Sequence, residues 1–199
     1  MKTKILSVAL AFAVMAGFTK NTYAAVNANS NYTVLNDIKT INKIEVRGNV
    51  QLFISDNMPE KVTVYNKYYA ESALVQNKNG VLRISSYNNE KLIVWVSSES
   101  LRSVSAFDNA EVKSFGNVSK IEFDIDLHDN ASANLKFDSY SANVTLRDHA
   151  SVILSGRVEE FGMNRNVNSL VVNNGLSVGR NTQNKVEMGA GKQMVAGLE

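Results

Sequence analysis

Three acidic residues spaced two apart are the side chains of this sequence best suited to chemistry. Glu122, Asp124 and Asp126 alternate with apolar residues, so a β-strand would present all three on one face. Adjacent carboxyl groups would lie about 6.8 Å apart along the strand, near the lower end of the separation in inverting glycosidases. A strand face offers no cleft that would raise the pKa of one carboxyl. We therefore interpret the three residues as a solvated acidic stripe, with weak Ca²⁺ binding as the alternative.

The two histidines are the other candidates for metal binding or proton transfer. The chain has no cysteine, so a metal site would require His128 and His149 to be joined by Asp129 or Asp148. Asp148, His149 and Ser151 have the composition of a catalytic triad, but adjacent residues cannot readily serve as both orienting acid and base around one nucleophile. We interpret both histidines as solvated turn residues, and the sequence predicts no catalytic residue, no metal site and no cofactor.

Aromatic residues of the N-terminal part form the remaining candidate ligand surface. Exposed aromatic rings can stack on sugar rings, whereas buried rings would fasten a cap to the core. The second interpretation is favoured, and the first stays as an alternative. The residues concerned are Tyr65, Tyr68, Tyr69, Tyr87 and Trp95.

The segment that carries the acidic stripe and the histidines is built from similar repeats. Its markers are Asp-Asn-Ala at 108–110, Asp-Asn-Ala-Ser at 129–132, Asp-His-Ala-Ser at 148–151, and a degenerate fourth copy at 163–167. A second turn follows each marker, at 116–117, 138–139, 156–157 and 173–175. Two turns and two strand-length segments per period predict one coil of a β-solenoid.

The turn residues have a conformational reason. Sharp corners between strands often require φ > 0, which Asn and Asp tolerate best after Gly. We predict a column of marker residues, one in each repeat, that hydrogen-bond from coil to coil: Asn109, Asn130, His149 and Asn166. In the neighbouring column, bare stacked carboxylates would repel one another: Asp108, Asp129 and Asp148.

These repeats resemble the head GIN domain family of auto-transporter adhesins, found in Bacteroidetes envelope proteins. Members carry Ser-Gly-Ala-Ser-like turns between short strands, and here Asn or His stands in the place of the Gly at 109, 130 and 149. The resemblance covers the chain from about Ile41 to the C-terminus. It implies the fold more directly than the function, and it suggests an adhesin-like role.

The segment 1–24 is typical of a secretory signal peptide. A basic start with Lys2 and Lys4 precedes an apolar stretch over 5–18, and Thr22-Tyr23-Ala24 provides a small-x-small cleavage site. This apolar stretch is too short to span a bilayer comfortably, and no later stretch is long enough. The absence of Cys excludes a lipid anchor at that site. We expect a secreted protein, periplasmic or on the cell surface, that is not a lipoprotein.

The mature chain is expected to form one domain. The formal charge of +2 becomes −1 once Lys2, Lys4 and Lys20 are removed, so we expect no binding to nucleic acid. The segment 25–40 is expected to be a loosely ordered leader, and 41–199 the solenoid domain. Within it, 41–97 is expected to hold the first coils and an N-terminal β-rich cap, with a hairpin at Asn79-Gly80.

We therefore predict an all-β, single-domain β-solenoid, with coils of about 17–21 residues, and no enzyme activity. The leading hypothesis is an adhesin-like or cell-envelope module that binds a surface glycan or an envelope protein. A carbohydrate-binding or polysaccharide-processing β-helix is the alternative, which a groove lined by Tyr or Trp would favour. A scaffold that stacks end to end is the third, which an uncovered apolar terminal coil would favour.

Overall fold

The computed structural model describes residues 31–35, 38, 40–56, 58–66 and 69–183. The expected signal peptide, most of the leader, and Tyr68 lie outside these residues. Strands account for most of the described chain, with one short 3₁₀ helix, η1 (Tyr69–Glu71). The strands are β1 (Thr33–Leu35), β2 (Lys43–Gly48), β3 (Val50–Ser55), β4 (Lys61–Val64), β5 (Ala73–Lys78), β6 (Val81–Ser86), β7 (Leu92–Ser97), β8 (Ser103–Ala106), β9 (Glu111–Ser114), β10 (Val118–Leu127), β11 (Ser132–Leu146), β12 (Ser151–Arg165) and β13 (Leu170–Gln183).

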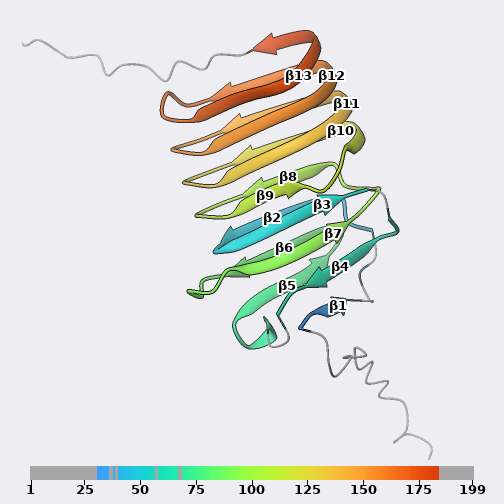
Figure 1. The fold of residues 1–199 in the computed structure, drawn as a ribbon, viewed down its shortest axis with the longest axis vertical. Helices are drawn as coiled ribbons and strands as arrows, with labels where there is room; N and C mark the ends of the chain where they lie inside the picture. Colours follow the sequence, from blue (N-terminus) through green and yellow to red (C-terminus); the bar gives the residue numbers. More distant parts are fainter. Residues whose placement is uncertain (1–30, 36–37, 39, 57, 67–68, 184–199) are drawn as a thin grey trace, which may run out of the picture.

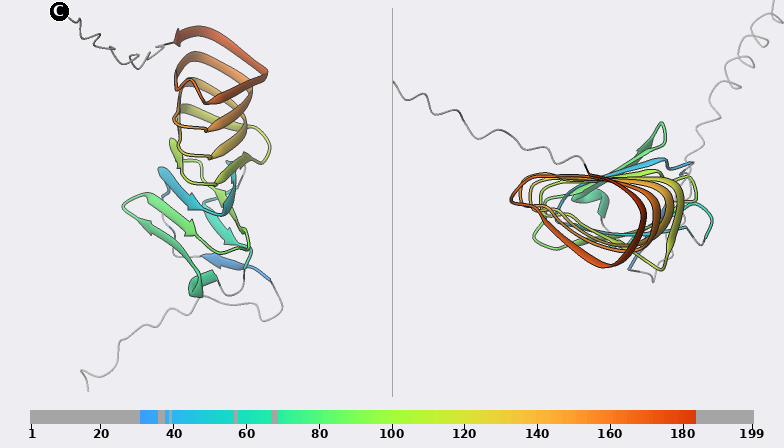
Figure 2. Two further views of the ribbon diagram at one scale, coloured as in Figure 1. Left: turned by 90° about the vertical axis from the view of Figure 1, so that its left-hand side faces the viewer. Right: turned by 90° about the horizontal axis from the view of Figure 1, so that it is seen from above.

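These thirteen strands join one curled sheet, so the all-β prediction is confirmed (Figure 1). From β10 onwards the pairing is parallel, and in the pairs β10–β11 and β11–β12 each residue lies beside its counterpart in the next repeat. Phe123 pairs with Ala142, and Ala142 pairs with Phe161, so the two pairs are separated by the same number of residues along the chain. Seen from above, the strands wind around a common interior (Figure 2).

The N-terminal strands do not stack in sequence order, contrary to the expectation for 41–97. Strand β2 lies between β6 and β8, and β3 lies between β7 and β9. The chain therefore leaves after β3, forms β4, η1 and β5, and returns on the far side of β2 and β3. Lys43 consequently pairs with Val81 on one side and Ser103 on the other, and neither step equals the repeat length.

Antiparallel strands cover the N-terminal end of the sheet. Strand β5 pairs with β6, β4 with β7, and β1 with β4. The hairpin between β5 and β6 turns at Asn79 (φ 53°) and Gly80 (φ 78°), as the sequence predicts. These strands occupy the place expected for the β-rich cap.

The core follows from the alternation of side chains along each strand. Leu127 and Leu146 are 0% and 1% exposed, and they stack as direct register partners of neighbouring strands. Phe123 and Phe137 meet edge to face with ring centroids 5.7 Å apart. Burying one such side chain stabilises the fold by about 1.5–3 kcal/mol. A single continuous core runs from Ile41 to Phe161.

The second turn of each repeat is a bend rather than a break in three of the four copies. Strands β11, β12 and β13 run through 138–139, 156–157 and 173–175, and the chain leaves strand conformation only around Gly116. In β12 the bend is at Gly156 (φ 111°), beside a register shift between β12 and β13. A Cβ at Gly156 would lie 2.0 Å from the carbonyl oxygen of Phe137, so only Gly fits there.

Leu127→Asp should unfold the domain, whereas Asp124→Ala should shift the melting temperature by no more than about 2–4 °C. Burying an unpaired carboxylate at Leu127 costs several kcal/mol, comparable with the total stability of an ordinary domain, whereas Asp124 is exposed. Thermal melting followed by circular dichroism measures both. A Leu127→Asp variant that melts like the wild type would show that this side chain does not point inward.

Candidate functional site

The left-handed corner residue of each turn is the aspartate, and this differs from the prediction for the marker residues. Asp108, Asp129 and Asp148 have φ of 60°, 56° and 56°. The next residue in each turn instead joins the backbone ladder. The amide of Asn130 donates to the carbonyl oxygen of Asp108 at 2.9 Å, and His149 donates to Asp129 at 2.9 Å.

The aspartate carboxylates form a ladder from strand to strand instead of repelling. The Asp129 carboxylate accepts the backbone N–H of Asp108 at 3.0 Å, and the Asp148 carboxylate accepts that of Asp129 at 3.2 Å. The Asp108 carboxylate accepts the N–H of Gly48 at 3.0 Å, which ties the repeats to β2. Each negative charge therefore faces an N–H donor, a favourable charge-assisted contact. We call this set of contacts the aspartate ladder.

The turn of the fourth repeat lies two positions further along the chain than the sequence predicts. The amide of Asn166 donates to the carbonyl oxygen of Leu146, just as Arg147 donates to Leu127. Asn166 therefore corresponds to Arg147 rather than to His149, and Asn168 takes the marker place of this repeat. Val167 stands where the other repeats have aspartate, so the aspartate ladder ends at Asp148.

His128 is half-buried, which differs from its interpretation as a solvated turn residue. Its ring stacks on Phe107 with centroids 4.6 Å apart, and the Arg47 guanidinium lies over the Phe107 ring at 3.7 Å from its centroid. His128 Nε2 lies 3.0 Å from a carboxylate oxygen of Asp126. His149, in contrast, is exposed. The two histidines thus occupy different places of the turn and form no common site.

The acidic stripe lies on the outer face of β10. Glu122 and Asp124 are exposed, and Asp126 is half-buried. Asp124 accepts a hydrogen bond from Asn143 at 3.0 Å, while Asp126 pairs with His128 and lies 3.9 Å from Arg147. Among the described residues, no three His, Asp or Glu side chains gather closely enough to hold a metal ion. Two of the three carboxylates are thus engaged with neighbouring side chains.

Aromatic side chains gather on the outer face of β4, β7, β3 and β9, which are successive neighbours in the sheet (Figure 1). Trp95 is at the centre, with ring centroids 5.0 Å from Phe53, 4.6 Å from Phe115 and 6.3 Å from Tyr65. Tyr32 adds a further ring, 5.8 Å from Tyr65. Phe115 is 56% exposed and Tyr65 is 46% exposed. We call these five residues the aromatic face.

The aromatic face contains only two of the five aromatic residues singled out from the sequence, Tyr65 and Trp95. Tyr87 lies at the turns, where its hydroxyl donates to the Asp108 carboxylate at 3.2 Å. Tyr69 is in η1, and Tyr68 is outside the described residues. Sequence reasoning missed Tyr32, Phe53 and Phe115, which come from three other segments of the chain.

Trp95 reaches the surface because β7 alternates between inside and outside. The run 92–96 is continuously apolar, a pattern typical of a strand covered on both faces. Its burial alternates instead, and Ile93 and Trp95 face outward, only partly covered. The outer face of this sheet is thus apolar at the very place where a monomeric protein would ordinarily be polar.

A charged cluster borders the aromatic face at the start of β9. The Glu111 carboxylate accepts hydrogen bonds from Lys91 and from Gln51, the latter at 2.8 Å, and lies 3.2 Å from Lys113 Nζ. These contacts, with Lys91 first, lower the pKa of Glu111 from 4.5 to about 2, against partial burial, which raises it. Glu111 is therefore a fully engaged carboxylate.

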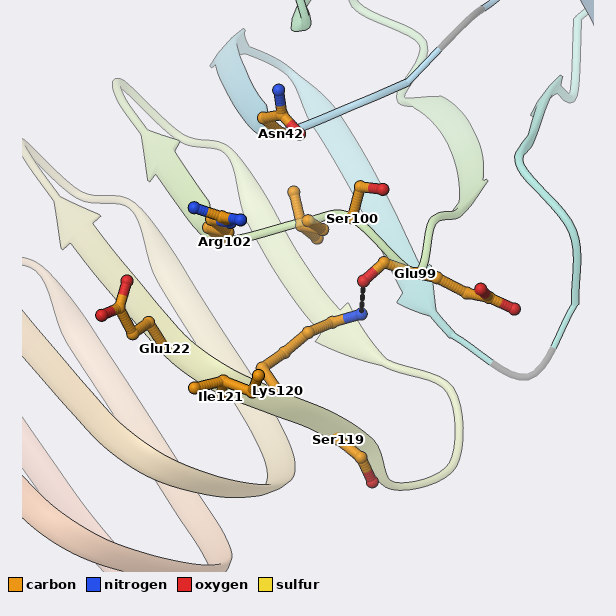
Figure 3. Close-up of a pocket in the computed structure, with 9 residues that line it drawn as sticks. Asn42, Glu99, Ser100, Arg102, Ser119, Lys120, Ile121 and Glu122 are labelled. Carbon is orange, nitrogen blue, oxygen red and sulfur yellow. Dashed lines mark hydrogen bonds between the residues drawn. The ribbon is translucent and has the colours of Figure 1, made fainter.

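A groove of about 430 Å³ lies elsewhere, where β8 and β10 begin (Figure 3). Arg102, Glu122 and the 80% exposed Ile121 form part of its rim. Lys120 lines the groove and donates to the carbonyl oxygen of Glu99 at 3.1 Å (Figure 3). It also donates to the carbonyl oxygen of Ser98 at 2.8 Å.

The Lys120 ammonium also lies 3.7 Å from the Asp56 carboxylate. Burial lowers the pKa of Lys120, against Asp56 and Glu99, which raise it. The amine thus has two carbonyl oxygens and one carboxylate as partners. These contacts connect the segments that follow β3 and β7 to the start of β10. The sequence offers no pattern that would single it out.

Comparison with known proteins agrees with this architecture. A family model described as "Putative auto-transporter adhesin, head GIN domain" matches residues 40–190. No curated protein matches the chain. Crystal structures of a "putative adhesin" from Parabacteroides merdae (16% identity, TM-score 0.57) and one from Parabacteroides distasonis (17%, 0.56) are similar, each over 78% of both chains. A "putative lipid binding protein" from Parabacteroides distasonis is similar over 79% of this chain and 78% of its own (9%, 0.58).

These identities establish similarity of fold only. With regard to membranes, the described residues contain no helix that is long and apolar enough to cross one.

The aspartate ladder can be tested with three substitutions of Asp129. Asp129→Asn keeps an acceptor oxygen and tolerates φ > 0, so it should cost under about 0.5 kcal/mol. Asp129→Gly loses the acceptor only, about 1 kcal/mol, and Asp129→Ala also strains the backbone, about 2 kcal/mol in total. Urea unfolding should give this order of stability. Equal values for the Asn and Ala variants would contradict the ladder.

The Glu111 cluster makes a pH-dependent contribution whose sign is fixed by its lowered pKa. The contribution is complete above the unfolded-state value of 4.5 and is lost as the pH falls through about 2. Glu111→Gln should therefore melt below the wild type at pH 7, and the difference should vanish towards pH 2. Glu122→Gln, on an exposed strand face, is the matched control. A difference that is constant across this range would contradict the assignment.

Proposed function

The chain belongs to the head GIN domain family of auto-transporter adhesins, and we propose that it is a non-catalytic, adhesin-like module that binds a partner through the aromatic face. The observation that carries the proposal is the exposure of that face. Phe115 and Tyr65 each present about half of their surface to solvent around Trp95, on a rigid sheet. Large apolar patches on soluble proteins ordinarily mark interaction sites, and Tyr and Trp are enriched among residues that dominate binding energy.

We further infer that the repeats form coils of a β-solenoid. The parallel pairing of equivalent residues from β10 to β12, the common interior and the turn contacts between neighbouring repeats support this description. In such an architecture the outer faces extend over many strands, which suits a module that binds large partners. The aromatic face would then occupy the N-terminal half of one long side.

Secretion belongs to the same proposal. The basic start, apolar stretch and cleavage site over 1–24 favour export by a signal peptide, and the adhesin-like family favours an extracellular or envelope location. The mature domain would start near 25 and carry no lipid anchor at that site. The aspartate-rich turns would be structural, because their carboxylates are occupied by backbone N–H groups.

End-to-end stacking is less well supported as a function. Strands β5, β4 and β1 cover the N-terminal end with antiparallel pairing, so a second molecule would not find a free parallel strand there. Leu170 and Val172 of β13 are 60% and 41% exposed at the other end. A covered end and an apolar end do not form two matching surfaces, which a growing filament requires.

The proposal is tested by the retention of residues 25–199 on an array of polysaccharides, purified envelope proteins and phospholipid vesicles. The wild type should be retained by at least one class of probe, and Tyr65→Ala/Phe115→Ala should weaken retention about tenfold or more, since each exposed ring contributes on the order of 1 kcal/mol. Tyr140→Ala is the matched control, because Tyr140 is 58% exposed and lies on another part of the surface, in a hollow that Ile121 and Arg157 also line.

Three results of this experiment would contradict the proposal. Retention that is equal in the wild type and the double variant, or that falls equally in Tyr140→Ala, would show that the aromatic face is not the binding surface. A wild type that no probe retains would also contradict the proposal.

A further inference from the structure

We propose that the aromatic face binds sugar chains that carry acidic groups. This inference rests on the proposed function and names the class of partner for the same surface. It depends on three features of the face: exposed aromatic rings, lysines without an ion pair beside them, and carboxylates that accept hydrogen bonds from the protein itself.

The rings are suited to sugars because they lie on the outside of a rigid sheet. One side of a pyranose ring presents C–H bonds only, and it packs against an aromatic ring while the hydroxyl groups stay hydrated. Tyr65, Trp95 and Phe115 come from successive parts of the sheet and lie beside one another across its strands. An extended polymer could therefore contact several rings in turn without entering a pocket.

Two lysines flank these rings on the same outer face. Lys61 is on β4, two residues before Thr63, which is the register partner of Trp95. Lys136 is on β11, where its amide donates to the hydroxyl of Ser114, directly before Phe115. Both side chains are exposed, and neither forms an ion pair with any residue that the structure describes.

The neighbouring carboxylates are already engaged. Glu60 accepts hydrogen bonds from the backbone of Ile41 and the hydroxyl of Ser98, at 2.7 and 2.9 Å. Asp138, next to Lys136 on the same face of β11, accepts from Asn117 and from the amide of Arg157, at 2.9 and 3.0 Å. Glu111 is occupied by Lys91, Gln51 and Lys113 as described above.

Hydrogen bonds from neutral groups do not remove the charges of Glu60 and Asp138, but neither carboxylate lies within ion-pair distance of Lys61 or Lys136, so both ammonium groups stay available next to the apolar rings. A ligand that complements the aromatic face alternates apolar faces with negative charges, and a polymer of acidic sugars has this pattern along its whole length. A neutral glycan would leave Lys61 and Lys136 without partners, and a purely apolar partner would bury their charges at a cost. Charge complementarity thus favours the acidic polymer.

The test compares two polymers with the same sugar backbone, one negatively charged and one neutral. Polygalacturonate and its methyl-esterified form share one backbone, and their binding to residues 25–199 is measured by biolayer interferometry at two salt concentrations. We expect polygalacturonate to bind at least tenfold more tightly than the ester, and to weaken as salt rises. Phe115→Ala and Lys61→Gln/Lys136→Gln should each weaken it at least fivefold.

The matched control for charge is Lys78→Gln/Arg102→Gln, which removes the same number of positive charges from exposed positions away from the aromatic face. It should leave binding within about twofold of the wild type, since screening weakens charges that lie farther from a ligand than about 10 Å. Equal loss in the two double variants would reduce the effect to net charge and overturn the proposed site.

The outcomes separate this inference from the function on which it rests. Equal binding of the two polymers, or binding that does not depend on Lys61 and Lys136, would overturn the acidic-sugar inference. If Phe115→Ala instead abolishes retention on proteins or phospholipid vesicles alone, the aromatic face is still the binding surface and only its partner is wrong. If no probe depends on Phe115, both proposals fail.

Discussion

The aspartate ladder is the interaction on which the regular part of the structure depends. At each of three turns, a single aspartate adopts φ near 60° and also supplies the carboxylate that accepts an N–H from the neighbouring layer. Aspartate does both, whereas Gly could turn the corner but could not accept a hydrogen bond through a side chain. Because these contacts hold neighbouring turns in register, the strands that leave each turn begin at matching heights. Apolar residues are thereby stacked on apolar residues through the core.

The ladder also explains why the outer faces are available for binding. Backbone pairing, core packing and the turn contacts stabilise the sheet, so its stability does not depend on the chemistry of every outward side chain. Lys113, Phe53 and Trp95 can then vary in chemistry at neighbouring register positions. The aromatic face is a place where outward residues are apolar, and it borders a charged cluster around Glu111 in which the carboxylate is fully engaged.

Much of the fold follows from the sequence because alternation and turn composition are local properties. The strands over 118–165, the hairpin at Asn79-Gly80 and the aspartate-containing turns were all visible in this way. The insertion of β2 and β3 between later strands was not, because pairing between Lys43 and Ser103 depends on contacts far apart in the chain. The aromatic face was only half visible for the same reason: Phe53 and Phe115 join Trp95 through pairing across the sheet. The position of the fourth turn could not be predicted from the sequence, because Val167 stands in place of the aspartate that marks the other turns.

The central claim is that the protein engages its partner through the aromatic face of an otherwise structural fold. Hydrogen–deuterium exchange of residues 25–199, with and without polygalacturonate, tests it most directly, since added protection identifies the strands that the ligand contacts. The account predicts protection confined to β4, β7, β3 and β9, the loop that carries Phe115, and the part of β11 around Lys136. Protection centred on the groove around Arg102 and Ile121, or on the aspartate turns, would contradict it.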